Sequence, residues 1–310
     1  MEQAVSLTEG DIRSTPEILA GTIARVEQCR GTLAPMLTGP LVLLGCGSSH
    51  CVALAGADLY EAHGHGPAQA VFPSDYVPRP DWLHLAISRT GQTTELVGAM
   101  RRAKAAGARV ILLEGEPDSP AAASADVCLP LAFAPEQGII QTRFVSAALL
   151  ALRLLFGGTA AHEALAGLPQ HMEEALAAFD PQPLLAAAHR VFLGRDWRYG
   201  LARAAAVHLQ ETALLVPEAH QTLEYRHGPL AAADARTLVW CFDAPEEEAS
   251  RVVLAEVRRA GAVVRCTPDD PLIALAEAQL LAVRVAVAHG VDPDAPRNLS
   301  RAIVMPAAEA

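Results

Sequence analysis

The stretch LVLLGCGSS, residues 41–49, decides the fold. Its run of four apolar residues is typical of a short strand that is buried on both faces of a parallel sheet. A loop rich in glycine and serine follows at once, and an alanine- and leucine-rich helical pattern then continues to about residue 63. Strand, polar loop and helix in this order are the first half of a βαβ unit, so the stretch predicts an α/β protein.

The same order of elements continues to residue 156. A second apolar strand at 83–87 leads into the polar loop SRTGQTTE at 88–95. Further elements are expected as a helix at 93–106, strands at 109–113 and 127–129, and a long helix at 139–156. Strands that alternate with helices predict a doubly wound parallel sheet flanked by helices.

The second half of the chain repeats this plan. Apolar strands are expected at 190–194, 237–241 and 262–266, with helices at 200–215, 251–260 and 271–289. We therefore expect two subdomains with one fold. The predicted segments are an N-terminal helical segment at 1–35, a first subdomain at 36–157, a helical linker at 158–185, a second subdomain at 186–290 and a tail at 291–310.

Composition and charge limit the possible functions. A chain of 310 residues that is 51% hydrophobic can bury the cores of two subdomains. Its net charge of −11, with scattered lysines and arginines, argues against nucleic-acid binding, which needs a basic face. No secretory signal opens the sequence, and the longest apolar run, 145–156, is too short to span a membrane. We expect a cytoplasmic protein with no membrane or nucleic-acid partner.

The cysteines point to a reducing compartment. The six cysteines form no CxxC pair and show no regular framework spacing. Disulfides and structural zinc are therefore not expected, nor is any other metal or cofactor.

Two hydroxyl-rich loops predict an anion site. The loops at 47–49 and 88–93 each follow a strand and lead into a helix, so both lie at the carboxyl edge of one sheet. Backbone N–H groups, hydroxyls and a helix N-terminus together bind phosphate without much positive charge. Serine and threonine at these positions also serve as helix caps, and for either loop alone capping is the better explanation. Two such loops on successive strands favour a phosphate site.

The two loops resemble the signature loops of the sugar isomerase (SIS) family. The segments EYRHGPL at 224–230 and DPDAPRNLSR at 292–301 narrow the resemblance to the double-SIS isomerase domain of glucosamine-6-phosphate synthase. The similarity extends from about residue 40 to about residue 304. It implies a five-stranded flavodoxin-like sheet in each half and a homodimer.

The resemblance also implies roles for individual residues. Ile139, at the start of the long helix, matches a position whose backbone touches the sugar. Arg89 stands where the synthase has a glutamine, and it could add a charge near the phosphate. The residues that match the phosphate-binding loops are Gly47, Ser48, Ser49, Ser88, Arg89, Thr90, Gln92 and Thr93.

Glu211 matches the family's catalytic carboxylate, which moves a proton between sugar carbons 1 and 2. Its predicted helix is nearly all Ala, Leu and Val, and His208 lies three residues away on the same face. Partial desolvation there would raise the pKa of Glu211 toward the range of a general base. From spacing alone, a solvated helix glutamate is the simpler interpretation.

His227 matches the histidine that reaches into the neighbouring subunit's site and opens the sugar ring. An imidazole titrates in the range that such a role needs. Gly228-Pro229 follows it and would hold the turn that aims the ring. Without the resemblance, a loop histidine bonded to backbone is an equally good interpretation.

Two positions depart from the family. The synthase has lysines where this chain has His208 and Arg301, and both lysines contact the sugar. Arg301 can supply charge but cannot deprotonate or form a Schiff base. His208 can transfer protons but is shorter. These changes put synthase activity in doubt and leave proton transfer intact.

The favoured function is hydrolytic deamination of glucosamine 6-phosphate to fructose 6-phosphate and ammonia. No glutaminase pattern precedes the first SIS loop, so we expect no internal source of ammonia for the reverse reaction. Fructosamine-6-phosphate deglycase and aminotransferase-like isomerase activities are the enzymatic alternatives. A non-catalytic sugar-phosphate sensor is the alternative of another class.

Overall fold

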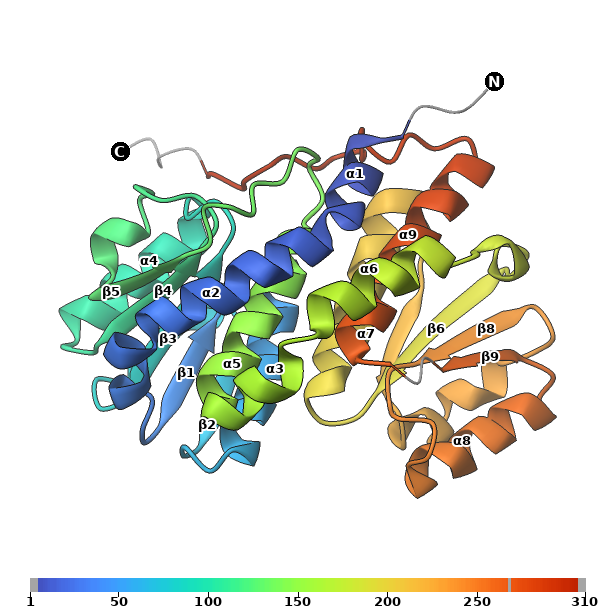
Figure 1. The fold of residues 1–310 in the computed structure, drawn as a ribbon, viewed down its shortest axis with the longest axis horizontal. Helices are drawn as coiled ribbons and strands as arrows, with labels where there is room; N and C mark the ends of the chain where they lie inside the picture. Colours follow the sequence, from blue (N-terminus) through green and yellow to red (C-terminus); the bar gives the residue numbers. More distant parts are fainter. Residues whose placement is uncertain (1–4, 267–268, 306–310) are drawn as a thin grey trace.

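A computed structural model describes residues 5–266 and 269–305. Two parallel sheets face each other across a layer of helices (Figure 1). The first sheet has the strand order β2-β1-β3-β4-β5 and the second has the order β7-β6-β8-β9. The strands are β1 (Leu41–Leu44), β2 (Ala68–Val71), β3 (Leu83–Ser88), β4 (Val110–Glu114), β5 (Val127–Pro130), β6 (His189–Gly194), β7 (Glu218–Gln221), β8 (Thr237–Cys241) and β9 (Val263–Cys266).

The helices form three layers. One helix, α4, covers the outer face of the first sheet, and α8 covers the outer face of the second. The remaining helices fill the space between and beside the inner faces (Figure 1). The helices are α1 (Leu7–Arg13), α2 (Thr15–Leu33), α3 (Ser48–Ala62), α4 (Thr94–Ala105), α5 (Arg143–Leu165), α6 (Leu168–Ala178), α7 (Trp197–Ala213), α8 (Glu248–Arg259) and α9 (Pro271–Ala288).

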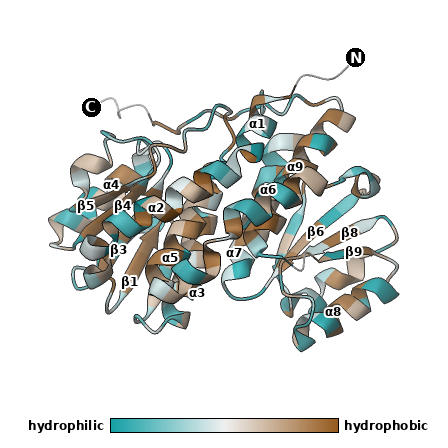
Figure 2. Ribbon diagram, viewed as in Figure 1, coloured by the Kyte–Doolittle hydropathy of each residue, from teal (hydrophilic) through white to brown (hydrophobic). Residues whose placement is uncertain are grey.

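The deciding stretch begins with a strand, as predicted, and this strand, β1, lies between β2 and β3. Successive residues of a strand point to opposite faces, so Leu41 and Leu43 enter the core between the sheets, while Val42 and Leu44 pack under α4. All four are fully buried. Figure 2 shows apolar colour concentrated on such strands and on the helices between the sheets. The α/β fold class with two parallel sheets flanked by helices is confirmed.

Two helices have the length and hydropathy of membrane spans, α5 and α9. The most apolar windows of these helices are 67% and 78% buried inside the molecule, respectively. Both helices contribute to the core between the sheets. Their apolar character is therefore explained by packing on protein, as in the core helices of a soluble protein.

Several predicted details are wrong. The short strands β2 and β7 were not predicted, because they lie at sheet edges, are only partly buried and carry polar residues. The implied fifth strand of the second sheet is not found among the described residues, since the chain leaves β9 and enters α9 at Pro271. The division into subdomains and linker stays a prediction; residue 158, where the predicted linker begins, is Gly158, whose φ of 63° kinks α5, and the predicted linker includes α6.

The long helix begins at Arg143 and not at Ile139. The buried carboxylate of Glu136 accepts hydrogen bonds from the backbone N–H groups of Thr142 and Phe144, at 2.7 and 2.9 Å. This contact caps α5 and keeps the preceding residues as a loop. Ile139 therefore lies in that loop, four residues before the helix.

The C-terminal tail returns from the second subdomain to the first (Figure 1). The Asp294 carboxylate accepts from the backbone N–H groups of Leu7 and Thr8, at 2.7 and 2.8 Å. Farther along, the Ile303 carbonyl accepts from Thr94 N–H, at the start of α4. The tail is thus bonded both to α1 and to the start of α4.

Candidate functional site

The first hydroxyl-rich loop is a tight turn between β1 and α3. Gly47 takes φ 53° and ψ −127°, a conformation that favours glycine. A Cβ on Gly45 would lie 2.5 Å from the Ser49 carbonyl oxygen, so the turn also needs glycine there. Ser48 and Ser49 open α3 and are buried. The helix N-terminus consequently faces the carboxyl edge of the sheet.

The second loop follows β3, which pairs directly with β1. Ser88 ends the strand, and its Oγ accepts from Gly91 N–H at 2.9 Å. The Thr90 hydroxyl accepts from Gln92 N–H at 3.3 Å, and Thr93 is the N-cap residue of α4. These two hydroxyls therefore shape the loop, whereas no side-chain hydrogen bond caps the start of α3 or of α4. The two loops still adjoin each other, because neighbouring parallel strands end at one edge.

Arg89 is buried and joins three segments. Its Nη1 donates to the Ile139 carbonyl at 2.8 Å, and its Nη2 donates to the Arg301 carbonyl at 2.7 Å. The guanidinium therefore connects the second loop, the loop before α5 and the tail. Its Nε is buried without a hydrogen-bond partner among the described residues. Two nitrogens of the charge that was expected near a phosphate are thus occupied by backbone carbonyls.

The Arg301 side chain is also engaged. Its Nη2 lies 2.6 Å from Glu116 Oε1, and its Nη1 donates to the Glu136 carbonyl at 2.9 Å. Glu116 neutralises the charge that was expected to reach the sugar. In this structure, Arg301 holds the tail against the first subdomain.

Glu211 lines a pocket of about 400 Å³ on α7. Burial raises the pKa of Glu211 to about 7, and the positive charge of Arg89 opposes this rise. A carboxylate with such a pKa can both accept and return a proton near neutral pH. The pocket is lined by Val207, Gln210, Glu211, Leu214, Leu215, Val216, Arg297 and Leu299, so the tail contributes to it.

His208 lies one helical turn from Glu211 and is completely enclosed. Its Nδ1 is 2.9 Å from Nε2 of Gln279 on α9. Burial lowers the pKa of His208 to about 4, with the nearby backbone of Gln141 acting in the opposite direction. The imidazole is therefore neutral at physiological pH.

His227 is exposed on the loop that follows β7. It lies between two short 3₁₀ helices, Glu224–Arg226 and Pro229–Ala232, and Gly228 after it has φ 139°. Its backbone N–H donates to the Glu224 carbonyl at 2.9 Å. Among the described residues, no hydrogen bond or ion pair joins His227 to Glu211. One chain alone thus does not bring these two predicted residues into contact.

Part of the sequence matches a known protein family. The SIS domain family model matches residues 39–157, which contain both hydroxyl-rich loops. This part of the chain, the first subdomain, therefore matches a SIS domain. Over 359 aligned residues the chain is 28% identical to glutamine–fructose-6-phosphate aminotransferase (isomerizing) of Xylella fastidiosa. That alignment covers 95% of this chain and 58% of the relative, so the chain spans less than two thirds of the relative's length.

Two solved structures resemble this chain over most of its length. The crystal structure of glucosamine-6-phosphate deaminase from Thermotoga maritima is 26% identical, with a TM-score of 0.82, and the match covers 97% of this chain and 100% of that one. The C-terminal domain of glucosamine-fructose-6-phosphate aminotransferase from Francisella tularensis shares the fold. It is 20% identical, has a TM-score of 0.82, and the match covers 94% and 99% of the two chains.

Several polar residues around the SIS loops were not predicted. Gln141 is one, since its Oε1 accepts from the Ser49 hydroxyl at 3.4 Å. Gln279 is another, and its position inside the apolar run of α9 was a signal that could have been used. Glu116 and Glu136 had no such signal, because their contacts with Arg301 depend on where the tail lies.

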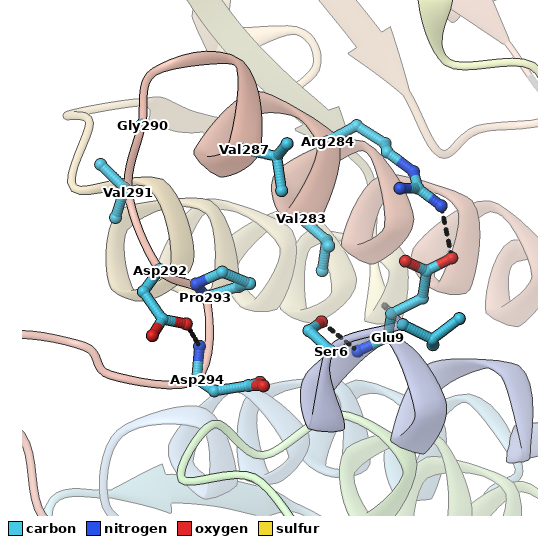
Figure 3. Close-up of a pocket in the computed structure, with 11 residues that line it drawn as sticks. Ser6, Glu9, Val283, Arg284, Val287, Gly290, Val291, Asp292, Pro293 and Asp294 are labelled. Carbon is cyan, nitrogen blue, oxygen red and sulfur yellow. Dashed lines mark hydrogen bonds and ion pairs between the residues drawn. The ribbon is translucent and has the colours of Figure 1, made fainter. Parts of the chain in front are cut away.

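Another cavity lies away from this site, between α1, the end of α9 and residues 290–294 (Figure 3). It measures about 490 Å³. Its polar groups already bond one another: Glu9 Oε1 pairs with Arg284 Nη2 at 2.5 Å, and Asp292 accepts from Asp294 N–H at 2.9 Å. These contacts join α1, α9 and the tail, so the cavity is a structural junction.

Proposed function

We propose that this SIS-domain protein is a phosphosugar isomerase that converts glucosamine 6-phosphate and water to fructose 6-phosphate and ammonia. The observation that carries the proposal is Glu211, which lines a pocket with its pKa raised to about 7 by burial. The likeness to a glucosamine-6-phosphate deaminase over nearly the full length of both chains supports the choice of reaction.

Binding of the phosphate falls to the two loops of the first subdomain. Ser48, Ser49 and Thr93 stand at the starts of α3 and α4, where backbone N–H groups and helix dipoles favour an anion. Gly47, Ser88, Thr90 and Gln92 complete the loops. The Ile139 carbonyl already accepts from Arg89 Nη1 at 2.8 Å, and in this proposal the backbone beside it contacts the sugar. This arrangement explains how a protein of net charge −11 binds a phosphate ester.

The proposed reaction has three stages. His227 moves the proton of the C1 hydroxyl to the ring oxygen, which opens the ring to a C1 aldehyde. The Glu211 carboxylate then takes the proton from C2 and returns it to C1, while one proton of the C2 amine passes to the C1 oxygen. The C1 aldehyde thereby becomes a primary alcohol and the C2 amine becomes an imine. Water adds to the C2 imine and ammonia leaves, which yields the ketone of fructose 6-phosphate. Each proton removed is delivered within the cycle, so Glu211 ends ionised.

The exposed position of His227 favours a site shared between two subunits. A histidine that contacts no catalytic residue of its own chain can act only if the loop reaches another copy or the substrate. We therefore propose a homodimer in which His227 completes the partner's site. The expected compartment is the cytoplasm.

The decisive experiment mixes purified protein with glucosamine 6-phosphate and measures ammonia and fructose 6-phosphate. Equal amounts of both products are expected. Glu211→Gln should lower kcat by about 10³-fold, the range of a general base, while still binding substrate. Glu173→Gln, on the exposed surface of α6, is the matched control and should keep full activity.

Other outcomes would select the alternatives. Binding of the sugar phosphate without any product would favour the sensor. Release of glucose 6-phosphate and a free amine from a fructosamine 6-phosphate would favour the deglycase. Full activity in Glu211→Gln would overturn the proposed mechanism.

The shared site is tested by subunit mixing. Glu211→Gln and His227→Ala dimers, each inactive, are unfolded together and refolded. Mixed dimers contain one intact pair of residues, so partial activity should return. No recovery despite proven subunit exchange would show that each subunit is self-contained.

A further inference from the structure

Two cysteines lie side by side at the carboxyl ends of β8 and β9. Cys241 is the last residue of β8, Cys266 is the last residue of β9, and the two are partners in the parallel ladder. Both belong to the apolar cluster that α8 covers, so their side chains point to the same face of the sheet. Neighbouring strands stand about 4.8 Å apart, inside the range of about 4.4–6.8 Å between the Cα atoms of a disulfide. The two sulfurs can therefore be joined while both strands keep their places in the sheet.

A hydrogen bond between the two thiols makes them chemically unequal. Cys241 donates to Cys266, and this contact raises the pKa of Cys241 and lowers the pKa of Cys266. The positive charge of Arg258, near the end of α8, also lowers the pKa of Cys266, while burial and the carboxylate of Asp243 oppose the change. The thiolate is the nucleophilic form of cysteine, so Cys266 is the more reactive member of the pair.

Access from solvent distinguishes the two cysteines in the same sense. Cys241 is fully buried, whereas Cys266 is half-buried and lies on β9, at the edge of the second sheet. By contrast, burial raises the pKa of the Cys46, Cys51 and Cys128 thiols to about 11, 12 and 11. A small oxidant therefore reacts at Cys266 before it reacts at these three thiols or at Cys241.

We propose that Cys241 and Cys266 are a reversible oxidation site, which closes to a disulfide when the protein meets a hydroperoxide. The Cys266 thiolate attacks the O–O bond of the peroxide. An S–O bond forms as the O–O bond breaks, Cys266 is oxidised to a sulfenic acid, and the peroxide is reduced to an alcohol, or to water in the case of hydrogen peroxide.

Cys241 completes the reaction as the resolving thiol. It loses its proton and attacks the sulfur of Cys266, so an S–S bond forms as the S–O bond breaks. The hydroxide that leaves takes up the proton of Cys241 and departs as water. In sum, two thiols and one hydroperoxide give one disulfide, one alcohol and one water.

The disulfide should be easily reduced again. The strand spacing of about 4.8 Å is shorter than the usual Cα separation in disulfides, about 5.5–6 Å, so the bond is strained. Strained disulfides are the labile ones, and a cellular dithiol returns the pair to thiols. While it lasts, the bond closes a covalent loop that contains α8 and ties β9 to its neighbour β8.

The experiment is chemical and does not depend on turnover, so its failure leaves the proposed deaminase reaction untouched. Reduced protein is treated with hydrogen peroxide, its free thiols are alkylated, and its peptides are identified by mass spectrometry. We expect one cross-linked peptide pair that contains Cys241 and Cys266 and lacks the mass of two hydrogen atoms. Dithiothreitol should restore both thiols.

Single variants separate the two roles. Cys241→Ser removes the resolving thiol, so Cys266 should accumulate as a sulfenic acid that dimedone labels. Cys266→Ser removes the reactive thiol, so position 241 should lose both the cross-link and the dimedone label. Cys128→Ser, which changes another half-buried strand cysteine, is the matched control and should keep the cross-link. Circular dichroism checks that each variant is folded.

Three results would overturn the proposal. One is a pair that stays reduced while peroxide oxidises the methionines of the same sample. Another is a cross-link between either cysteine and a different partner. The third is oxidation of Cys266 in the unmodified protein to a sulfinic acid without any cross-link, since that would show that Cys241 does not resolve the sulfenic acid.

Discussion

The first loops of the two subdomains share one backbone conformation but carry different side chains. Gly47, at φ 53° and ψ −127°, precedes α3, and Asp196, at φ 49° and ψ −139°, precedes α7. Before them, Gly45 and Gly194 are equally constrained, because a Cβ would lie 2.5 and 2.3 Å from the carbonyls of Ser49 and Arg198. The backbone of the turn is therefore a property of the fold.

The side chains around the two turns differ. In the first subdomain, small hydroxyl residues begin the helix. In the second, the fully buried carboxylate of Asp243 accepts from Arg195 N–H, the Thr222 hydroxyl and the Ser250 hydroxyl, at 2.8, 2.6 and 2.7 Å. The second turn thus contains its own anion. This buried carboxylate distinguishes the second turn from the first, where we propose that the phosphate binds.

Loss of the internal anion should have the largest effect. Asp243→Asn removes the charge that three donors and the nearby Arg198 share, and we expect the free energy of unfolding to fall by about 3 kcal/mol. Urea unfolding measures this change. Asp81→Asn, an exposed aspartate before β3, should change little. Equal losses in both variants would contradict the internal role of Asp243.

Equivalent positions of the two turns should respond differently to truncation. Ser49→Ala removes a hydroxyl from the proposed phosphate loop, and the Kd for fructose 6-phosphate should rise about tenfold. Arg198→Ala, at the matching position of the second turn, should lower stability without changing Kd. Calorimetric titration measures both. A weaker Kd in Arg198→Ala alone would place the phosphate in the second subdomain.

The positive charge of Arg89 should affect how kcat/KM depends on pH. A general base acts when ionised, so kcat/KM should fall as pH falls through the Glu211 pKa of about 7. Removing the positive charge disfavours the ionised carboxylate, so Arg89→Gln should move this limb up by roughly one pH unit. Arg89→Lys keeps the charge and should move it less. A shift to lower pH would show that Arg89 does not act on Glu211.

The smallest effect concerns the turn itself. A residue with a Cβ is strained at the conformation of Asp196, so Asp196→Gly should stabilise the protein by about 1 kcal/mol. Gly47→Ala should destabilise it by a similar amount. Thermal unfolding of both variants tests the pair. Loss of stability in Asp196→Gly would mean that the side chain has a role that outweighs the strain.

The proposed site lies partly within reach of sequence reasoning. The hydroxyl-rich loops were found because each follows a buried strand, and neighbouring parallel strands end together. Glu211 was chosen by resemblance, and its enclosure agrees with the apolar helix around it. The contacts that engage the side chains of Arg89 and Arg301 could not be predicted, because their partners come from segments distant in sequence.

The sequence alone determined the α/β class, the repeat of one plan in two subdomains and the tight glycine turn, since these follow from local patterns of apolar residues and glycine. Tertiary structure decided which groups are free. It placed Asp243 inside the second turn, Gln279 against His208 and the tail over the first subdomain. The physical reason is that burial and hydrogen-bond partners depend on contacts between distant segments, which no local pattern encodes.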